Sequence, residues 1–201
     1  MSQENPERAA AIAAIEKLGG KLRFDQTRVE TVGFDQTAVT DADLAHVKVL
    51  TGVNTISLRF AKVSGTGFEH FKALPELKNL YLPGSTVGDA GLEQLKNVPS
   101  LVNLYLQETK ITDAGLEHLK GLKNLRTLYL SETKITDKGV EHVKDLTLAS
   151  LYLNGTAVTD ACIEYLTPMK KLVNLDVRKT KVTDEGVKRL QQTLPGCVIQ
   201  K

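Results

Sequence analysis

The chain has 201 residues, of which 41% are hydrophobic and 25% are charged. A chain of this length and composition can bury one continuous core, so no second domain is needed. Its 26 basic and 24 acidic residues give a formal net charge of +2. Nucleic-acid binding requires a basic stripe with aromatic platforms, and none runs the length of the sequence. We therefore expect no nucleic-acid partner.

Residues 1–28 are predicted to form an N-terminal cap made of a helix and a leader strand. Asn5 suits the N-cap position, Pro6 suits the first helical position, and the glycines at 19–20 end the helix. Residues 21–25 then read as an extended segment. The acidic residues and the interrupted, alanine-rich apolar run are unlike a signal peptide or a membrane span, so no membrane partner is expected.

Residues 29–201 repeat one pattern about seven times, with a period of 24 residues. The first strand column of this repeat runs Val32, Ile56, Leu80, Leu104, Leu128, Leu151 and Leu175. The step from Leu128 to Leu151 is one residue short, which places a deletion in the turn between helix and strand. A unit of this length cannot bury its own apolar side, so the units must stack as coils of a solenoid.

Within each coil the apolar spacing changes from two to three residues. A second apolar column lies two residues after the first and runs Phe34, Leu58, Leu82, Leu106, Leu130, Leu153 and Val177. This alternation predicts a half-buried strand. Leu92, Leu95 and Val98 are then three residues apart, as on one face of a short helix. The strands should form a parallel sheet on the inner curve, with the helices outside.

Residues 101–119 read Leu-x-x-Leu-x-Leu-x-x-Thr-x-Ile-Thr-Asp-x-Gly-Leu-x-x-Leu, and 125–143 repeat this with Val in place of the last two Leu. This pattern resembles the leucine-rich repeat family in its Thr-Asp-x-Gly-Leu variety, which is associated with F-box proteins and planctomycete-like bacteria. The resemblance covers residues 29–199. It implies an α/β fold, a right-handed leucine-rich repeat solenoid with a parallel concave β-sheet and short convex helices.

Two hydroxyl columns and one acidic column accompany the repeat. The first hydroxyl column should bridge to backbone in the neighbouring coil, and it includes Thr37, Ser85, Thr109, Thr133, Thr156 and Thr180. The second should cap the helices, and it includes Thr40, Ser64, Thr112, Thr136, Thr159 and Thr183. The Asp that follows should face the positive end of the helix dipole. The second coil has Ser-Gly-Thr-Gly at 64–67 and loses this acid, so its helix should be irregular.

Metal binding, cofactor binding and catalysis are not indicated. Each coil offers one carboxylate without a second ligand at loop spacing. The histidines His46, His70, His118 and His142 recur in one helical column, where they lie too far apart to share a zinc ion. None has a nucleophile beside it. The two cysteines, Cys162 and Cys197, favour a reducing, cytoplasmic compartment, and Cys162 is expected to be a packed small residue.

The residues that point outward from the inner sheet are the candidate binding site. Their column reads Gly33, Ser57, Tyr81, Tyr105, Tyr129, Tyr152 and Asp176. With flanking polar residues, the predicted ligand-binding set is Tyr81, Tyr105, Tyr129, Tyr152, Asn79, Asn103, Gln107, Asp176 and Arg178. Four successive tyrosines suit a recognition strip, because Tyr provides contact area and a hydroxyl. Cross-strand packing inherited by duplicated repeats is an equal alternative.

We therefore expect a non-enzymatic module that recognises a protein or peptide on its concave face. Carbohydrate binding by the tyrosine column is the alternative, and a substrate adaptor of a ubiquitin-ligase-like complex is implied only by the resemblance. Residues 197–201 read as a final strand with a free edge, which predicts weak self-association. A basic cluster near this end is interpreted as a solvated face rather than an anion site. It comprises Lys170, Lys171, Arg178, Lys179, Lys181, Lys188 and Arg189.

Overall fold

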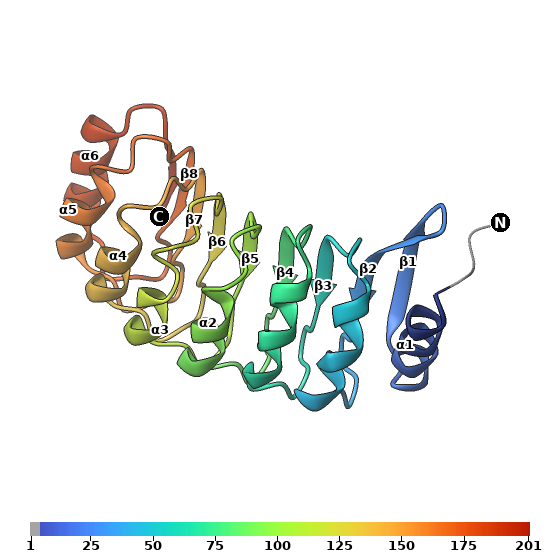
Figure 1. Cartoon of the computed structure of the whole chain (residues 1–201). Coiled ribbons are helices and arrows are strands. Elements are labelled where there is room, and N and C mark those ends of the chain that lie inside the picture. Colours follow the sequence, from blue (N-terminus) through green and yellow to red (C-terminus); the bar gives the residue numbers. More distant parts are fainter. Residues whose placement is uncertain (1–4) are drawn as a thin grey trace.

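The computed structural model describes residues 5–201, and the first four residues of the predicted cap lie outside this range. Nine strands in the described part form one sheet, in the order of the sequence (Figure 1). The strands are β1 (Lys21–Asp25), β2 (Arg28–Gly33), β3 (Thr55–Ser57), β4 (Asn79–Tyr81), β5 (Asn103–Tyr105), β6 (Thr127–Tyr129), β7 (Ser150–Tyr152), β8 (Asn174–Asp176) and β9 (Val198–Gln200).

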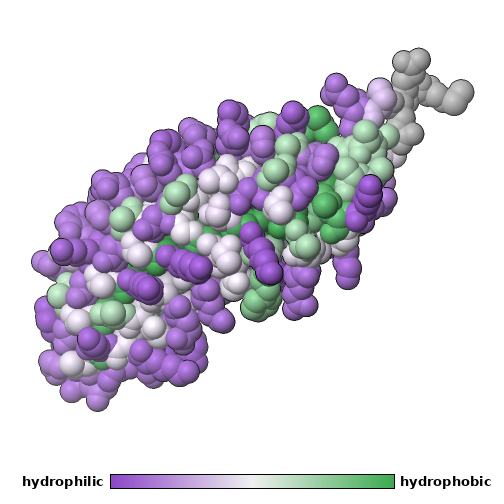
Figure 2. All heavy atoms as spheres, turned by 90° about the horizontal axis from the view of Figure 1, so that it is seen from below, coloured by the Kyte–Doolittle hydropathy of each residue, from purple (hydrophilic) through white to green (hydrophobic). Residues whose placement is uncertain are grey.

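Helices line the outer side of this curved sheet, as the repeat predicts (Figure 1). The α-helices are α1 (Pro6–Lys17), α2 (Asp89–Leu95), α3 (Asp113–Glu117), α4 (Asp137–Val143), α5 (Ile163–Leu166) and α6 (Asp184–Thr193). Three 3-10 helices are η1 (Ala42–Val49), η2 (Thr66–Ala73) and η3 (Asp160–Cys162). Seen from below, hydrophilic residues cover most of the surface, and hydrophobic ones gather toward the N-terminal end (Figure 2). None of the helices between residues 5 and 201 has the length and apolar character that crossing a bilayer requires.

The strands from β2 to β9 pair in parallel, and the predicted strand column lies in register. Leu80 pairs with Leu104, Leu104 with Leu128, and Leu128 with Leu151. The shortened step between the last two therefore leaves the register intact. β1 differs from the expected parallel arrangement, because it returns antiparallel to β2 with Lys21 opposite Gly33.

The N-terminal helix begins and ends where the sequence predicts. The side chain of Asn5 accepts a hydrogen bond from the Glu7 amide at 3.0 Å, and Pro6 opens the helix. Beyond the last helical residue, Gly19 takes a left-handed conformation with φ of 78°, which suits glycine. Ile15 is fully buried against the repeats. The helix contacts η1 and β1 and so covers the first coil.

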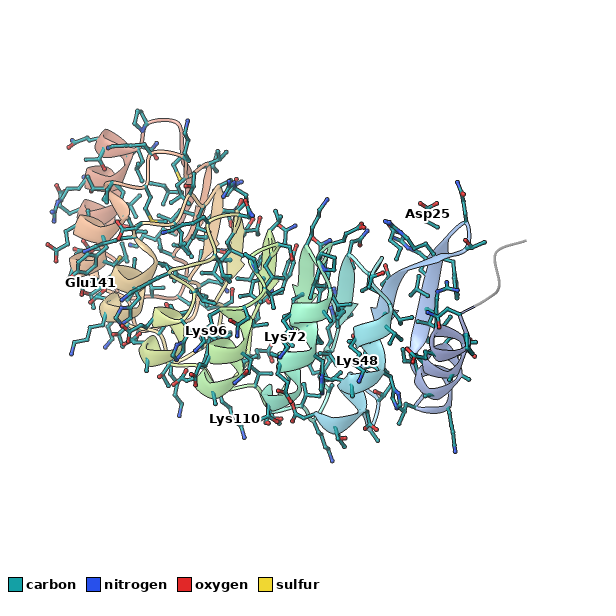
Figure 3. The ribbon with its side chains drawn as sticks, in the orientation of Figure 1. Asp25, Lys48, Lys72, Lys96, Lys110 and Glu141 are labelled. Atoms are coloured by element: carbon teal, nitrogen blue, oxygen red, sulfur yellow. The ribbon has the colours of Figure 1, made fainter. Side chains whose placement is uncertain are left out.

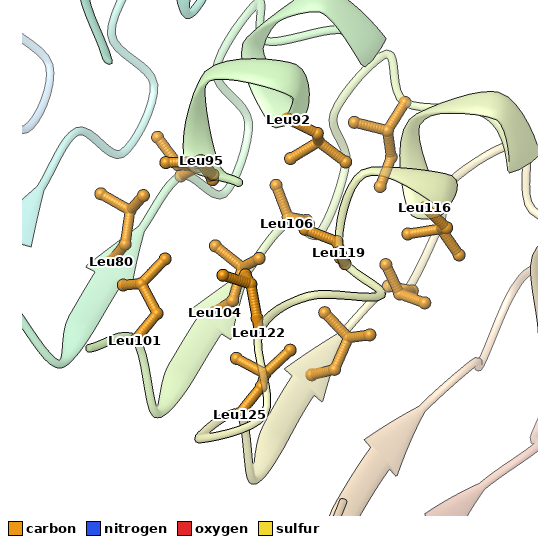
Figure 4. Close-up of a cluster of buried hydrophobic side chains, with 14 of the residues drawn as sticks. Leu80, Leu92, Leu95, Leu101, Leu104, Leu106, Leu116, Leu119, Leu122 and Leu125 are labelled. Atoms are coloured by element: carbon orange, nitrogen blue, oxygen red, sulfur yellow. The ribbon is translucent and has the colours of Figure 1, made fainter. Parts of the chain in front are cut away.

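Leucines from successive coils form one continuous interior between sheet and helices (Figure 4). Leu80 and Leu104 come from the strands, whereas Leu92 and Leu116 come from the helices, and all four are fully buried. In the second coil, stacked Phe68 and Phe71 rings take the helical positions, with centroids 4.9 Å apart. The aliphatic period of the sequence is therefore the period of the core.

The acidic column links neighbouring coils, a role that the sequence reasoning missed. Asp113 accepts hydrogen bonds from the Thr136 amide at 2.8 Å and from the Thr136 hydroxyl at 2.6 Å. We call this arrangement a carboxylate bridge. The other bridges are Asp41–Ser64, Asp89–Thr112, Asp137–Thr159 and Asp160–Thr183. The hydroxyl and amide of Thr183 hold the pKa of Asp160 below its usual value, so this carboxylate stays ionised.

The predictions for the two hydroxyl columns are partly wrong. N-capping by the second column is confirmed at Thr136, Thr159 and Thr183. It is wrong at Thr40, Ser64 and Thr112, whose hydroxyls donate to a carboxylate instead. The first column does not reach the neighbouring coil. Its threonine hydroxyls donate to the carbonyl three residues earlier in the same coil, whereas the buried Ser85 hydroxyl has no hydrogen-bond partner among the described residues.

One junction, between the second and third coils, has no carboxylate bridge. Gly65 stands where the acid occurs in other coils, and Gly88 stands where the hydroxyl occurs in the next. A Cβ on Gly65 would lie 2.4 Å from the Gly91 Cα, so the backbones pack there directly. The predicted irregular helix is confirmed, since η2 is a 3-10 helix. η1 is also 3-10 although its coil keeps Asp41, so loss of the acid alone does not determine helix type.

The carboxylate bridges also explain the glycine of the Thr-Asp-x-Gly pattern. A Cβ on Gly139 would lie 2.4 Å from Asp113 Oδ1, the oxygen that accepts the Thr136 amide. Gly115 meets Asp89 in the same way. A Cβ at Gly115 or Gly139 therefore competes with the bridge from the preceding coil, whereas the coil with Cys162 at the equivalent position keeps its Asp137–Thr159 bridge.

Asp113→Ala is expected to lower the free energy of unfolding by about 1–3 kcal/mol, because two hydrogen bonds to a charged acceptor are lost. Urea denaturation followed by circular dichroism measures the change. Glu117→Ala is the matched control at the other end of α3, where the exposed pair with Lys120 contributes little. Equal losses in the two variants would contradict a stabilising role for the bridge.

Gly139→Ala separates two opposing effects. Helix propensity alone favours Ala over Gly by about 1 kcal/mol. We expect the variant to be less stable than the wild type, since the added Cβ displaces the Asp113 carboxylate. Gly121→Ala is the control, because a Cβ there meets nothing within 4 Å. A higher thermal midpoint for Gly139→Ala than for the wild type would show that the carboxylate moves aside at no cost.

Candidate functional site

Four tyrosines form a continuous stack on the concave face. The centroids of Tyr81 and Tyr105 are 4.3 Å apart, those of Tyr105 and Tyr129 are 4.7 Å apart, and those of Tyr129 and Tyr152 are 3.9 Å apart. The interplanar angles are 16°, 16° and 2°. Each ring comes from the last residue of β4 to β7, and each is half-buried. Register between neighbouring strands therefore brings the four rings together.

Stacking decides which part of each tyrosine is accessible. Tyr105 and Tyr129 have a neighbouring ring on both faces. The outer face of Tyr81 carries the Arg59 guanidinium, with its carbon 4.7 Å from the ring centroid. The stack thus presents mainly ring edges and hydroxyls, and the outer face of Tyr152 is the one ring face without a stacked neighbour among residues 5–201. Cross-strand packing is present, and it positions the same side chains that a ligand would contact.

A hydrogen-bonded polar row lies beside the stack. Asn103 donates to Asn79 at 2.7 Å, and Asn79 donates to Thr55 at 3.0 Å. On the other flank, the Oε1 of Gln107 is buried and has no hydrogen-bond partner among the described residues. The structure therefore brings Asn79, Asn103 and Gln107 to the predicted surface. The two asparagine side chains are already bonded to neighbours, whereas Gln107 keeps an acceptor unused.

Asp176 is not available at this surface. Its side chain is 2% exposed and accepts bonds from Arg178 Nε at 3.0 Å and from Arg178 Nη2 at 2.6 Å. Burial alone would raise the pKa of Asp176, but the bonds with Arg178 outweigh it and hold the pKa below its usual value. The expectation that Asp176 points outward to a ligand is wrong, because Arg178 folds back over it. Arg178 itself remains exposed.

Toward the N-terminus, the tyrosine column stops at the third coil. Small residues occupy the equivalent positions of the first two coils, and they leave a hollow. Gly33 and Ser57 occupy the two positions that precede Tyr81 in the column. The hollow has a volume of ≈ 650 Å³ and is lined by cationic and polar residues of β1 to β4 and their loops. The cations are Lys21, Arg23 and Arg59. Sequence reasoning missed them, although small residues in an aromatic column were the available signal.

The tyrosine hydroxyls and the Cys162 thiol are held in their neutral forms. Burial raises the pKa of Tyr105 to about 12, and the hydroxyl of Tyr81 adds to the shift. Burial and the Tyr152 hydroxyl also raise the pKa of Tyr129. The Cys162 thiol has its pKa raised to about 12 by burial and by nearby carboxylates. Cys162 is fully buried, which confirms a packing role.

The described part of the chain shows no assembled metal site. Across residues 5–201, no three His, Cys, Asp or Glu side chains lie close enough together to hold an ion. The repeated histidines sit on successive helical segments of the outer side, in η1, η2, α3 with its C-cap, and α4.

Stability is expected to fall as pH rises from about 10 to 12. A free tyrosine ionises near pH 10, whereas folded Tyr105 keeps its proton to about pH 12. In that window the unfolded chain binds fewer protons than the folded one, so higher pH favours unfolding. Tyr105→Phe should show a shallower fall in urea midpoints across this window. Identical slopes for the two proteins would contradict a raised pKa at Tyr105.

Comparison with known proteins identifies the repeats. A leucine rich repeat family model matches residues 99–158, and a second leucine rich repeat model matches residues 169–190. No curated protein matches the chain by sequence.

Solved structures provide three similar folds. Internalin C2 of Listeria monocytogenes is 17% identical with a TM-score of 0.62, and the match covers 100% of this chain and 98% of that one. The internalin inlF of the same organism is 21% identical with a TM-score of 0.59, covering 79% of this chain and 50% of that one. A plant ice-binding protein is 15% identical with a TM-score of 0.62, covering 98% of this chain and 78% of that one. At these identities the likeness concerns the fold alone. With the repeat matches and the parallel sheet, it establishes that the chain carries leucine-rich repeats and folds as a leucine-rich repeat solenoid with an N-terminal helix.

Proposed function

We propose that this protein is a non-enzymatic recognition module that binds a protein or peptide through its concave face. Leucine-rich repeats suggest protein–protein interaction, and the stack of four tyrosines is the observation that supports the concave face as the contact surface. Aromatic side chains that are already ordered lose little conformational entropy on binding. The raised pKa values of Tyr105 and Tyr129 keep these two hydroxyls in the neutral, hydrogen-bond-donating form.

The geometry favours a peptide over a sugar as the occupant of this surface. A sugar ring packs best against the open face of an aromatic ring. The faces of Tyr105 and Tyr129 are covered by their neighbours, and the outer face of Tyr81 is covered by Arg59. Ring edges and hydroxyls instead suit the mixed polar and apolar surface of a polypeptide.

We also infer that the repeats are of the 24-residue Thr-Asp-x-Gly-Leu variety, with residues 1–28 as cap and 29–201 as solenoid. The carboxylate bridges support this, because they give the Thr, Asp and Gly of the pattern a shared role. The same proposal places the protein in a reducing, cytoplasmic compartment, since Cys162 and Cys197 are buried free thiols.

Affinity capture from the source cell tests the binding face. The bait with Tyr81, Tyr105, Tyr129 and Tyr152 all changed to Ala should lose at least about 90% of a prey retained by the wild type, since such anchors dominate interface energy. The matched control changes Lys48, Lys72, Lys96 and Lys120 to Gln, four exposed residues one coil apart in the sequence. Figure 3 shows the first three on the helical side. Circular dichroism checks that both variants fold.

The all-Phe version of the same four tyrosines keeps the stack and removes only the hydroxyls. Retention of prey by this variant would assign recognition to the apolar edges, and partial loss would assign it to the hydroxyls. Capture that survives in the all-Ala variant but fails in the lysine control would move the binding surface to the convex side and refute the proposal.

A further inference from the structure

We propose that the hollow at the N-terminal end of the concave face binds an acidic side chain, Asp or Glu, of the peptide partner. This inference rests on the proposed function and states which side chain of the peptide the concave face would select. The hollow shares Asn79 and Tyr81 with the polar row and the tyrosine stack. A peptide that lies along the stack would therefore reach the hollow with one of its side chains.

Arg59 is the residue best prepared to receive a carboxylate. Its guanidinium makes no hydrogen bond to any residue in the described range 5–201, and its nearest carboxylate oxygen, on Asp35, is 3.9 Å away. The Arg59 side chain is 46% exposed. The guanidinium carbon lies over the Tyr81 ring, 4.7 Å from its centroid, and this contact holds the side chain at the mouth of the stack. A planar fork of free donors matches the two oxygens of a carboxylate.

Asp35 neutralises Arg59 only in part, because its Oδ2 lies 3.9 Å from Arg59 Nη1, beyond hydrogen-bond distance. Its Oδ1 accepts hydrogen bonds from the Ser57 hydroxyl at 2.5 Å and from the Arg59 amide at 3.0 Å. These bonds hold Asp35 at the floor of the hollow, beside the backbone. The guanidinium and the carboxylate are thus neighbours without a direct hydrogen bond.

β1 supplies two more cations on the opposite wall. Antiparallel pairing places Lys21 opposite Gly33, where the column lacks a large side chain, and Arg23 opposite Thr31, two residues away on the same strand. Arg23 pairs with Glu30 at 3.1 Å. Lys21 has no ion-pair partner among residues 5–201. Around the hollow, three cations therefore face two carboxylates.

The remaining concave face offers no comparable attraction for an anion. The tyrosine column and its polar flanks are uncharged from β4 to β7. At the far end, Asp176 and Arg178 neutralise each other in a bidentate pair. Charge complementarity thus favours an acidic side chain at the N-terminal end and fixes the direction in which a peptide lies. An aromatic side chain fits less well, since Arg59 already covers the open face of Tyr81.

A phage-displayed library of random decapeptides, selected on the full chain, tests this assignment. We expect the wild type to enrich peptides with Asp or Glu at one fixed position. The synthetic consensus peptide should bind about tenfold more tightly than its counterpart with Gln at that position, as expected for one charge-assisted contact. Fluorescence anisotropy of the labelled peptides measures both affinities.

A double-mutant cycle then identifies the partner of the acid. Arg59→Gln should lower the affinity for the acidic peptide about tenfold and leave the affinity for the Gln peptide nearly unchanged. This difference is the signature of a direct interaction between Arg59 and the acidic side chain. The affinity of Arg59→Lys for the acidic peptide should lie between those of the wild type and Arg59→Gln, since lysine keeps the charge but lacks the planar guanidinium donors. Lys21→Gln should lower the affinity for the acidic peptide less than Arg59→Gln does. Arg189→Gln, an exposed cation on α6 outside the hollow, is the control and should have no effect.

The failures of the two proposals are distinguishable. One outcome is a consensus peptide that has no acidic position and no longer binds when the four tyrosines are changed to Ala. This outcome would refute the acidic-side-chain site in the hollow and leave the proposed binding face supported. An acidic consensus with no coupling to Arg59 would also overturn the hollow. Enrichment of no peptide by the wild type would overturn both.

Discussion

Each coil of this protein completes its hydrogen bonds only with the coil that follows. The Leu82 amide donates to the Tyr105 carbonyl at 2.9 Å, and the Glu108 amide donates to the Ser131 carbonyl at 3.0 Å. At the start of the helical segments, the carboxylate bridges repeat this dependence with side chains. An isolated coil would leave these groups unpaired and its leucines exposed, so the array is stable only as a whole. The strict 24-residue period follows from this requirement.

The same register creates the candidate binding surface. Neighbouring strands lie about 4.8 Å apart, and the tyrosine centroids lie 3.9–4.7 Å apart. Equivalent residues on adjacent strands therefore stack without a special turn or loop. Structure and recognition are not competing explanations of this column. Packing orders the rings and leaves a row of ring edges and hydroxyls along the concave face, which is the surface of the proposed function.

Departures from the repeat carry the specific features of the molecule. Gly33 and Ser57 interrupt the aromatic column and open the hollow. Gly65 and Gly88 remove one carboxylate bridge and let two backbones pack closely. Asp176 replaces a tyrosine and is closed off by Arg178. Because identical coils would give a uniform surface, these exceptions are the positions at which one end of the concave face differs from the other.

The sequence by itself determined the features that depend on period and local chain geometry. It predicted the strand columns, the limits of α1 at Asn5 and Gly19, the irregular second coil and the outward column of tyrosines. Periodicity shows which side of the chain a residue faces, because strands and helices have fixed repeats. Only the tertiary structure decided which atoms meet between coils. The chain reversal between β1 and β2 brought Lys21 opposite Gly33, and Arg178 buried Asp176 within its own coil. The lateral offset of one coil on the next made Asp113 an acceptor for Thr136. That offset depends on the packing of side chains from different coils, which no single repeat encodes.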